Sequence, residues 1–293
     1  MIYQIIDAKK AEHKIGVSCK LMGVSASGYF AWRKRGCERR RLCRDQVALA
    51  HVRERFCLSG ETYGAPRIWH DLKEDNIRIG RNRIARLMRE NDLKAHPKRR
   101  FKKTTDSEHK GRISANLLAQ DFSATAPDQK WAADISYIWT AEGWLYLALV
   151  IDLFSRRIIG WAMSGRMKKG LAVTALRKAL AMRQFSEGLI HHSDRGSQYA
   201  SDDYQRLLAS HRIAQSMSGK GNCYDNAMME TVFKTIKSEM IWRISWQSRF
   251  EAERAIARYI DGFYNPVRRH SALGFQSPIN FEATCNLETL ALH

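Results

Sequence analysis

The pattern of apolar and polar positions changes character near residue 129. Downstream of it, short apolar or alternating runs predict strands, and runs with helical periodicity predict helices between them. The predicted strands lie at 130–140, 144–151, 158–163, 189–192 and 213–217, and the helices at 171–183, 202–211 and 226–240. Three strands followed by alternating helices and strands predict an α/β fold, with a mixed five-stranded sheet flanked by helices.

The first third of the chain shows a different, all-helical pattern. Gly23 follows a short helix, and Ser25 is placed to cap the next helix, which carries Tyr29, Phe30 and Trp32 and has a basic end. This is the outline of a helix-turn-helix. A small helical bundle that uses the same glycine turn and serine cap is the alternative.

A second helical unit begins at Tyr63-Gly64. Pro66 lies in the first turn of one helix, and Gly80 precedes another helix, whose expected buried stripe is Ile84, Leu87 and Met88. The arginines on the other faces of that helix are candidates for phosphate contact, with a merely solvated face as the alternative. They are Arg81, Arg83, Arg86 and Arg89.

The charge points to a partner. The chain has 49 Lys and Arg against 30 Asp and Glu, a formal net charge of +19. Residues 1–110 hold 27 basic and 13 acidic groups, a net of +14, which leaves +5 for the remainder. A positive charge concentrated in one region indicates a polyanion, of which nucleic acid is the commonest. The basic run Lys98, Arg99 and Arg100 extends this region.

Two classes of protein are disfavoured. The longest apolar run, residues 144–151, is too short to span a bilayer, and the first six residues lack the pattern of a signal peptide. We therefore expect a cytoplasmic protein with no membrane partner. The six cysteines form no CxxC pair, which indicates free thiols rather than a zinc site.

Three carboxylates lie at positions suited to chemistry. Asp134 is inside the first predicted strand, Asp194 directly follows the fourth, and Glu230 is one turn into the last core helix. Most acids only solvate a surface, so each alone says little. Together, three carboxylates from separate elements can converge and hold hard divalent cations through oxygen, as phosphoryl transfer requires.

The segments around these acids resemble the catalytic blocks of DDE transposases, which have a retroviral-integrase-type, ribonuclease-H-like core. The matching blocks are residues 134–138, 192–199 and 225–230, with 35 residues between Asp194 and Glu230 and Lys237 seven residues after the Glu. More narrowly, Tyr63-Gly64 and the tail at 264–278 are similar to the larger subunit, OrfB, of the insertion-sequence-three family. The resemblance covers about residues 13–282. The sequence differs from retroviral integrases in lacking their N-terminal His/Cys zinc module.

This resemblance implies a function. We expect metal-dependent DNA strand cleavage and strand transfer at the ends of an insertion sequence, with Asp134, Asp194 and Glu230 holding two Mg²⁺ ions, for which Mn²⁺ substitutes. Lys237 is expected to position DNA. The expected partners are terminal-repeat and target DNA, further copies of the chain assembled on DNA at the nucleoid, and a smaller upstream OrfA protein, free or fused.

The same reasoning divides the chain into five segments. They are a helix-turn-helix-like segment at 1–44, a second helix-turn-helix DNA-binding unit at 45–103, a linker at 104–125, a ribonuclease-H-like catalytic core at 126–242 and a helical extension at 243–293. The polar stretch between Pro97 and Pro127 indicates the linker.

Several alternatives stay open at this stage. Asp152 is either a fourth acid of the site or a turn-forming residue, and His192 either assists the site or is simply packed. The loop at 218–223 either covers DNA or is an ordinary connection. Arg268 and His270 either contact DNA or stabilise the C-terminal part. A DNA-binding regulator with an inactive core and a ribonuclease-H-like hydrolase are the competing functions.

Overall fold

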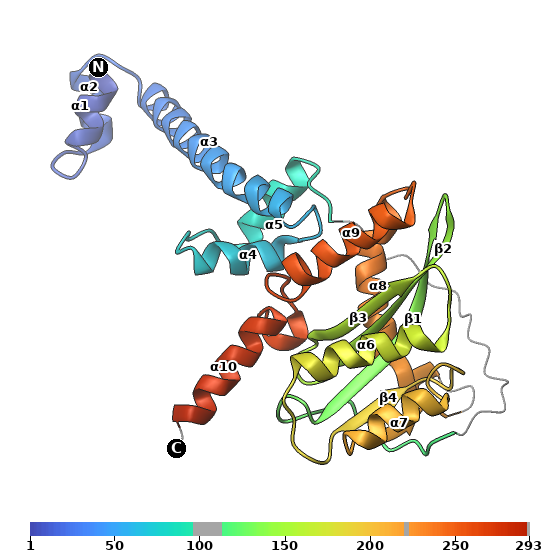
Figure 1. The fold of residues 1–293 in the computed structure, drawn as a ribbon. Coiled ribbons are helices and arrows are strands. Elements are labelled where there is room, and N and C mark those ends of the chain that lie inside the picture. The colour runs from blue at the N-terminus through green and yellow to red at the C-terminus, as the bar shows by residue number, and fades with distance from the viewer. Residues whose placement is uncertain (96–112, 220–222, 292–293) are drawn as a thin grey trace. The chain divides into compact units, whose positions relative to one another are not determined.

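The computed structural model describes residues 1–95, 113–219 and 223–291, and the chain divides into two units, residues 1–95 and 96–293 (Figure 1). Lys98, Arg99 and Arg100, candidates for phosphate contact, lie outside the described residues. No helix in the described ranges is both long enough and apolar enough to cross a membrane.

The first unit is all-helical, as predicted. Its helices are α1 (Ile2–Ala8), α2 (Ile15–Leu21), α3 (Ala26–Leu58), α4 (Ala65–Glu74) and α5 (Arg81–Glu90). The Ser25 side chain caps α3 by accepting a hydrogen bond from the backbone N–H of Gly28 at 3.1 Å. With no proline to interrupt it, α3 continues for 33 residues and crosses residue 44, where we expected a boundary. The two helix-turn-helix-like parts therefore share one helix.

Two apolar clusters stabilise this unit. Ile6, Cys19 and Tyr29 bring α1, α2 and the start of α3 together. At the other end of α3, Val52 and Phe56 are buried together with side chains of α4 and α5. The stripe expected on α5 is confirmed, since Ile84, Leu87 and Met88 are all buried. Each cluster thus supports its own pair of short helices.

The second unit contains a five-stranded mixed sheet, which confirms the predicted fold class. The strands are β1 (Lys130–Thr140), β2 (Gly143–Asp152), β3 (Ile158–Ser164), β4 (Ile190–Ser193) and β5 (Ala214–Met217), in the order β3-β2-β1-β4-β5. The β1–β2 and β2–β3 pairs are antiparallel, whereas β1–β4 and β4–β5 are parallel. The helices are α6 (Lys169–Met182), α7 (Asp202–Ser210), α8 (Ala227–Glu239), α9 (Arg249–Tyr259) and α10 (Pro278–Ala291).

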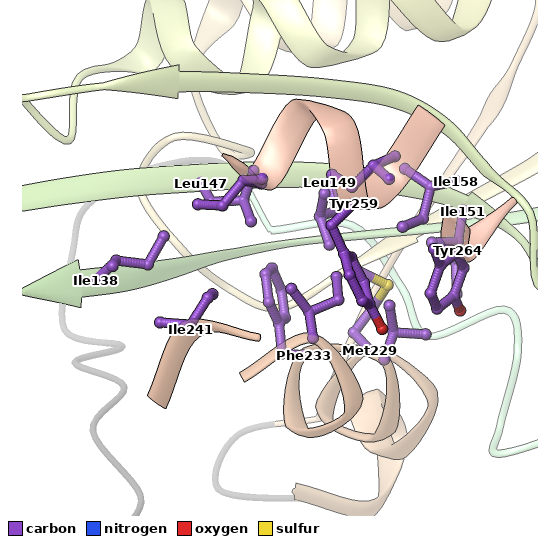
Figure 2. Close-up of a cluster of buried hydrophobic side chains, with 14 of the residues drawn as sticks. Ile138, Leu147, Leu149, Ile151, Ile158, Met229, Phe233, Ile241, Tyr259 and Tyr264 are labelled. Atoms are coloured by element: carbon purple, nitrogen blue, oxygen red, sulfur yellow. The ribbon is translucent and has the colours of Figure 1, made fainter. Parts of the chain in front are cut away.

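The sheet carries an apolar core on each face. Side chains of α6 and α7 pack with Trp131 and Val150 in one core. The other core joins Ile138 and Leu149 of the strands to α8 and α9 (Figure 2). A Cβ at Gly160 of β3 would lie 2.3 Å from a backbone oxygen of α6, so only glycine allows this close packing. Since neighbours along a strand face opposite sides, β1 contributes to both cores.

The C-terminal segment is built into the same unit. Ala252 and Ile256 of α9 and Tyr259 at its end belong to the core that contains α8. Glu282 of α10 accepts a hydrogen bond from Ser155 Oγ at 2.6 Å and pairs with Arg157 at 2.6 Å and with Arg183. The described part of the segment expected as a helical extension at 243–293 therefore packs into the second unit, through the core contacts of α9 and the ion pairs of Glu282.

The end of the expected linker is also structural. Leu117 N donates to Ser216 Oγ at 2.9 Å, and Met217 N donates to the carbonyl of Ala115 at 3.3 Å. Because β5 is an edge strand, its backbone groups need such a partner. The linker expected over 104–125 is thus shorter at its C-terminal end than the composition indicates.

Candidate catalytic site

The strand register places two of the predicted acids side by side. In the parallel β1–β4 pair, Ala133 lies opposite Ser193, so the next residues are Asp134 and Asp194. Neighbouring strands lie about 4.8 Å apart. Within the described sheet, β1 continues past Ala133 paired with β2 only, while the chain after β4 turns away. The two acids therefore lie at the carboxyl edge of β4, where open α/β sheets bind ligands.

Backbone N–H groups orient both carboxylates. Asp134 Oδ1 accepts from the N–H of Ile135 at 2.7 Å, and Asp194 Oδ1 accepts from the N–H of Gly196 at 2.9 Å. A Cβ at residue 196 would lie 2.9 Å from Asp194 Oδ1, so a larger residue there would displace the carboxylate. The local sequence thus holds each acid in one orientation.

Glu230 joins the pair from α8. It lies in the first turn of this helix and its side chain is exposed, while Met229 and Phe233 anchor the helix in the core. Burial raises the pKa of Asp134 well above its usual value, and the charge of Asp194 raises it further, as does that of Glu230. Hydrogen bonds from Ile135 and Asn226 act in the opposite direction. The charges of Asp194 and Glu230 thus both act on Asp134.

The donor set suits a hard divalent cation. All three acids offer carboxylate oxygens, and like charges gathered in a partly buried place favour a cation. The amide oxygen of Asn226 is buried with no hydrogen-bond partner in the described part of the chain. Among the described residues, however, no three His, Cys, Asp or Glu side chains are close enough to one another to hold a metal ion. The acids repel one another without forming a closed cage.

Lys237 lies on α8, the same helix as Glu230, and packs against β1. Its side chain is buried, and its Nζ lies 5.0 Å from the centre of the Tyr137 ring. Burial lowers the pKa of Lys237 to about 8, while the charge of Asp134 acts in the opposite direction. Because α8 packs on β1, the aliphatic part of Lys237 is buried and its ammonium group lies over the Tyr137 ring, within electrostatic range of Asp134.

Two further polar residues belong to the site and were not singled out from the sequence. Asn226 immediately precedes α8 and donates to Asp134. The hydroxyl of Tyr199 is buried without a hydrogen-bond partner in the described ranges, and burial together with the charge of Asp134 raises its pKa. Both lie inside the blocks that carry the family resemblance. Their place in these blocks was the only sequence signal for the two residues. It does not show whether such a residue faces the acids or caps a helix.

The structure resolves most of the open alternatives. Asp152 forms a turn, because its carboxylate accepts from the N–H groups of Asp128 and Phe154, each at 2.7 Å. His192 is packed between two serines, with Nδ1 2.8 Å from Ser216 Oγ and Nε2 3.2 Å from Ser218 Oγ. Half of the loop at 218–223, residues 220–222, lies outside the described residues.

Arg268 is structural rather than exposed. Its guanidinium forms two hydrogen bonds to Glu239, at 2.6 and 2.7 Å, and also lies 3.2 Å from a ring nitrogen of His270. Both Arg268 and Glu239 are buried side chains. The bidentate pair joins the end of α8, the helix of Glu230, to the segment after α9.

The arginines of α5 fall into two groups. Arg83 and Arg86 each lie 2.7 Å from a carboxylate oxygen of Asp45 on α3. Arg81 and Arg89 are exposed. Because α5 packs on α3, Asp45 competes with any phosphate for the first two arginines, whereas the exposed pair is open to solvent.

Comparisons with known proteins match both units. Residues 43–101 match the model of an HTH-like domain, and residues 124–223 and 211–278 match two models of the integrase core domain. An uncharacterized 31 kDa protein of insertion element IS600 from Shigella sonnei is 45% identical over 270 residues, which cover 90% of this chain and 96% of that protein. Transposase InsF for insertion sequence IS3A from Escherichia coli strain K12 is 42% identical over 287 residues, 96% of this chain and 98% of that protein.

Solved structures were found as well. The HTLV-2 integrase catalytic core domain in complex with magnesium, in its trimeric form, is 14% identical with a TM-score of 0.42, covering 55% of this chain and 99% of that one. The simian T-cell lymphotropic virus intasome in complex with PP2A regulatory subunit B56 gamma is 15% identical with a TM-score of 0.44, covering 74% of each chain.

Proposed function

This chain belongs to the IS3 family of transposases, which cleave DNA and transfer DNA strands, and we propose that Asp134, Asp194 and Glu230 carry that reaction in it. The observation that supports the assignment is the raised pKa of Asp134, caused by burial and by the charges of the other two acids. Acids gathered only for solvation would lie apart in water, where they repel one another least.

The chemistry follows from this arrangement. Strand cleavage and strand joining are both in-line displacements at phosphorus, with water and then a terminal 3′-hydroxyl as the attacking group. The three carboxylates would hold two divalent cations, Mg²⁺ with Mn²⁺ as a substitute, and these ions would supply activation of the attacking oxygen and charge neutralisation at the leaving oxygen. The reaction needs no nucleophile from the protein.

Other residues keep the acids in place for this task. The N–H groups of Ile135 and Gly196 and the amide of Asn226 fix the orientation of Asp134 and Asp194. Lys237, which also lies within the electrostatic reach of Asp134, places a cation beside the carboxylates. We assign Lys237 a role in positioning the reacting DNA, since a cation there attracts phosphate.

The partner of the chain is DNA, and its first unit supplies much of the positive charge. The HTH-like match at 43–101 lies inside the region of net charge +14. We propose that this unit binds the terminal repeats of the element, with Arg81 and Arg89 on phosphates, and that Lys98, Arg99 and Arg100 add further phosphate contacts. In this proposal the chain works in the cytoplasm at the nucleoid, as a homo-oligomer on DNA, with a smaller upstream OrfA partner, free or fused.

A cleavage assay tests the proposal. The full chain is incubated with duplex DNA from the ends of the element that encodes it, with and without Mg²⁺, and both end nicking and strand joining are measured. Asp134→Asn, Asp194→Asn and Glu230→Gln should each abolish both activities, and double variants should be scarcely worse, because the acids act as one unit. Glu187→Gln, an exposed acid paired with Arg212, is the matched control and should remain active.

Two results would contradict the assignment. Full activity of the Glu230→Gln protein would remove that residue from the reaction. A trapped covalent link between a tyrosine or serine and DNA would replace the water and hydroxyl chemistry by a protein nucleophile. Binding of terminal DNA should survive in all three amide variants, since neutralising an acid near phosphate relieves repulsion. Specific DNA binding with no cleavage by the unaltered chain would instead favour a regulator with an inactive core.

A further inference from the structure

The β1–β2 hairpin presents a row of aromatic rings at its tip. Trp139 and Trp144 are 61% and 43% exposed, and their ring centres lie 4.9 Å apart at an interplanar angle of 75°. The Tyr137 ring continues the row, with its centre 5.1 Å from that of Trp144. Trp139 pairs directly with Trp144 across the hairpin, and Tyr137 pairs with Tyr146. Directly opposed residues point to the same side, so these rings share one face.

The hairpin tip is braced rather than loose. Thr140 Oγ1 donates to the carbonyl of Gly143 at 2.7 Å, and Ala141 N donates to the carbonyl of Trp246 at 2.9 Å. The Arg249 guanidinium donates to the carbonyls of Glu142 and Trp144, at 2.7 and 3.1 Å. The rings are therefore held in a defined position, although leaving two neighbouring tryptophans in water forgoes their burial. Such an exposed patch in a soluble protein commonly marks a binding surface.

This aromatic row starts beside the acids. Tyr137 and Trp139 are three and five residues beyond Asp134, roughly 10 and 17 Å along the strand at about 3.4 Å per residue. The odd spacing turns their side chains to the other face of β1. The Tyr137 ring lies beneath the charged end of Lys237, which itself feels the charge of Asp134. In Figure 1 the long hairpin, labelled β2, projects beyond the remaining strands. The row thus starts at Lys237, beside the part of β1 that β4 does not cover, and leads away from Asp134 along the hairpin.

We propose that Tyr137, Trp144 and Trp139 form a stacking platform for unpaired bases of the DNA strand that reacts. In a duplex the faces of the bases are covered by their neighbours, so an exposed aromatic face can take only an unstacked base. Because unstacked bases lie farther apart along a strand than the 3.4 Å of a duplex, the platform lies within about five nucleotides of the phosphate at Asp134. The proposal depends on the function proposed above for the identity of that strand.

Cations accompany the rings, as a single-strand site requires. Arg166 and Lys168 are exposed directly after β3, whose last residue, Ser164, pairs with Tyr146, two residues from Trp144. These side chains are placed to meet the phosphates of a strand whose bases lie on the platform. A face made for docking another protein would not need this combination of flat rings and flanking positive charge.

The test uses the full chain without divalent cation, so that binding is measured in the absence of cleavage. The probes are a blunt duplex and the same duplex with a five-nucleotide single-stranded extension that contains 2-aminopurine, whose fluorescence falls when the base stacks. Trp139→Leu with Trp144→Leu keeps apolar surface but removes the flat rings, and Trp139→Phe with Trp144→Phe keeps both. Thermal unfolding of each variant checks that the hairpin change leaves the fold intact.

The unaltered chain should quench the 2-aminopurine and bind the extended duplex more tightly than the blunt one. The leucine pair should lose the quenching and bind the extended duplex about tenfold more weakly, near the lower end of what stacking of one base supplies. The phenylalanine pair should stay within about threefold of the unaltered chain. All three proteins should bind the blunt duplex equally.

Three results would overturn the proposal. One is an unaltered chain that leaves 2-aminopurine unquenched, a result that needs no variant. Another is equal affinity of the unaltered chain and the leucine pair for the extended duplex. The third is self-association of the unaltered chain that the leucine pair loses, with no change in binding of the extended duplex, which would make the face a contact between copies. Failure of the proposed function would show differently, as a lack of cleavage by the unaltered chain with Mg²⁺ on any probe.

Discussion

Replacing Arg268 by methionine should destabilise the second unit strongly while leaving the DNA-contacting surface unchanged. The Arg268 and Glu239 side chains are only 3% and 8% exposed, and two hydrogen bonds of 2.6 and 2.7 Å join them. Without the arginine, the Glu239 carboxylate stays buried with the hydroxyl of Tyr259, 2.7 Å away, as a remaining donor. Removing one partner of such a buried pair costs about 3–5 kcal/mol.

That loss is a large part of the stability of a domain, which is typically about 5–15 kcal/mol. Urea unfolding of the full chain, followed by tryptophan fluorescence and circular dichroism, measures it. With an m-value of about 2 kcal/mol/M, the midpoint of the unfolding transition should fall by roughly 1.5–2.5 M. Glu239→Gln should be destabilising as well, because it leaves the guanidinium buried with a weaker partner.

A compensating variant separates the ion pair from the packing around it. Arg268→Met, Glu239→Leu and Tyr259→Phe together replace all three polar groups by apolar ones, so no buried charge is left unpaired. The triple variant should recover most of the lost stability, since apolar replacements of buried ion pairs are often neutral or stabilising. If Arg268→Met leaves the urea midpoint unchanged and instead weakens DNA binding, the arginine contacts DNA and the structural interpretation is wrong.

Three further predictions concern other residues in the two units. Lys237→Ala should weaken binding of terminal DNA while leaving divalent-cation affinity nearly intact, measured by fluorescence anisotropy and by calorimetry; an equal loss of cation affinity would contradict a positioning role. In the first unit, Arg81→Ala with Arg89→Ala should reduce the slope of log Kobs against log[salt] by about two, at about 0.9 per phosphate, whereas an unchanged slope would leave these arginines solvated only. Burial, together with the charge of His192, lowers the pKa of His191 to about 3, below its unfolded value of 6.5, and the Tyr204 hydroxyl faces its ring at 3.0 Å. The neutral ring therefore stabilises the fold above pH 6.5, and this contribution is lost as the pH falls from 6.5 toward 3; urea midpoints across this range should show a steeper fall for the unaltered chain than for His191→Asn.

Much of the fold and the choice of catalytic residues followed from local patterns. The Ser25 cap, the buried stripe of α5 and the span of β1 depend on residues close together in the chain, and their periodicity is visible in the sequence. The three acids were identified in the same way, because each lies within a short block of distinctive residues. Their expected role as one reacting group remains a prediction to be tested by the amide variants.

Contacts between distant segments were beyond such patterns. Nothing local shows that Asp45 pairs with Arg83 and Arg86, or that Glu239 rather than DNA binds Arg268. A charged side chain has many possible partners in a chain of this composition, and which one it meets depends on the faces on which helices pack. The burial of Lys237 over Tyr137 likewise depends on the packing of α8 against β1. Periodicity shows which face of a helix or strand a residue occupies. Which segment packs against that face is decided only by the tertiary structure, because the hydrophobic effect is non-directional and does not select a partner.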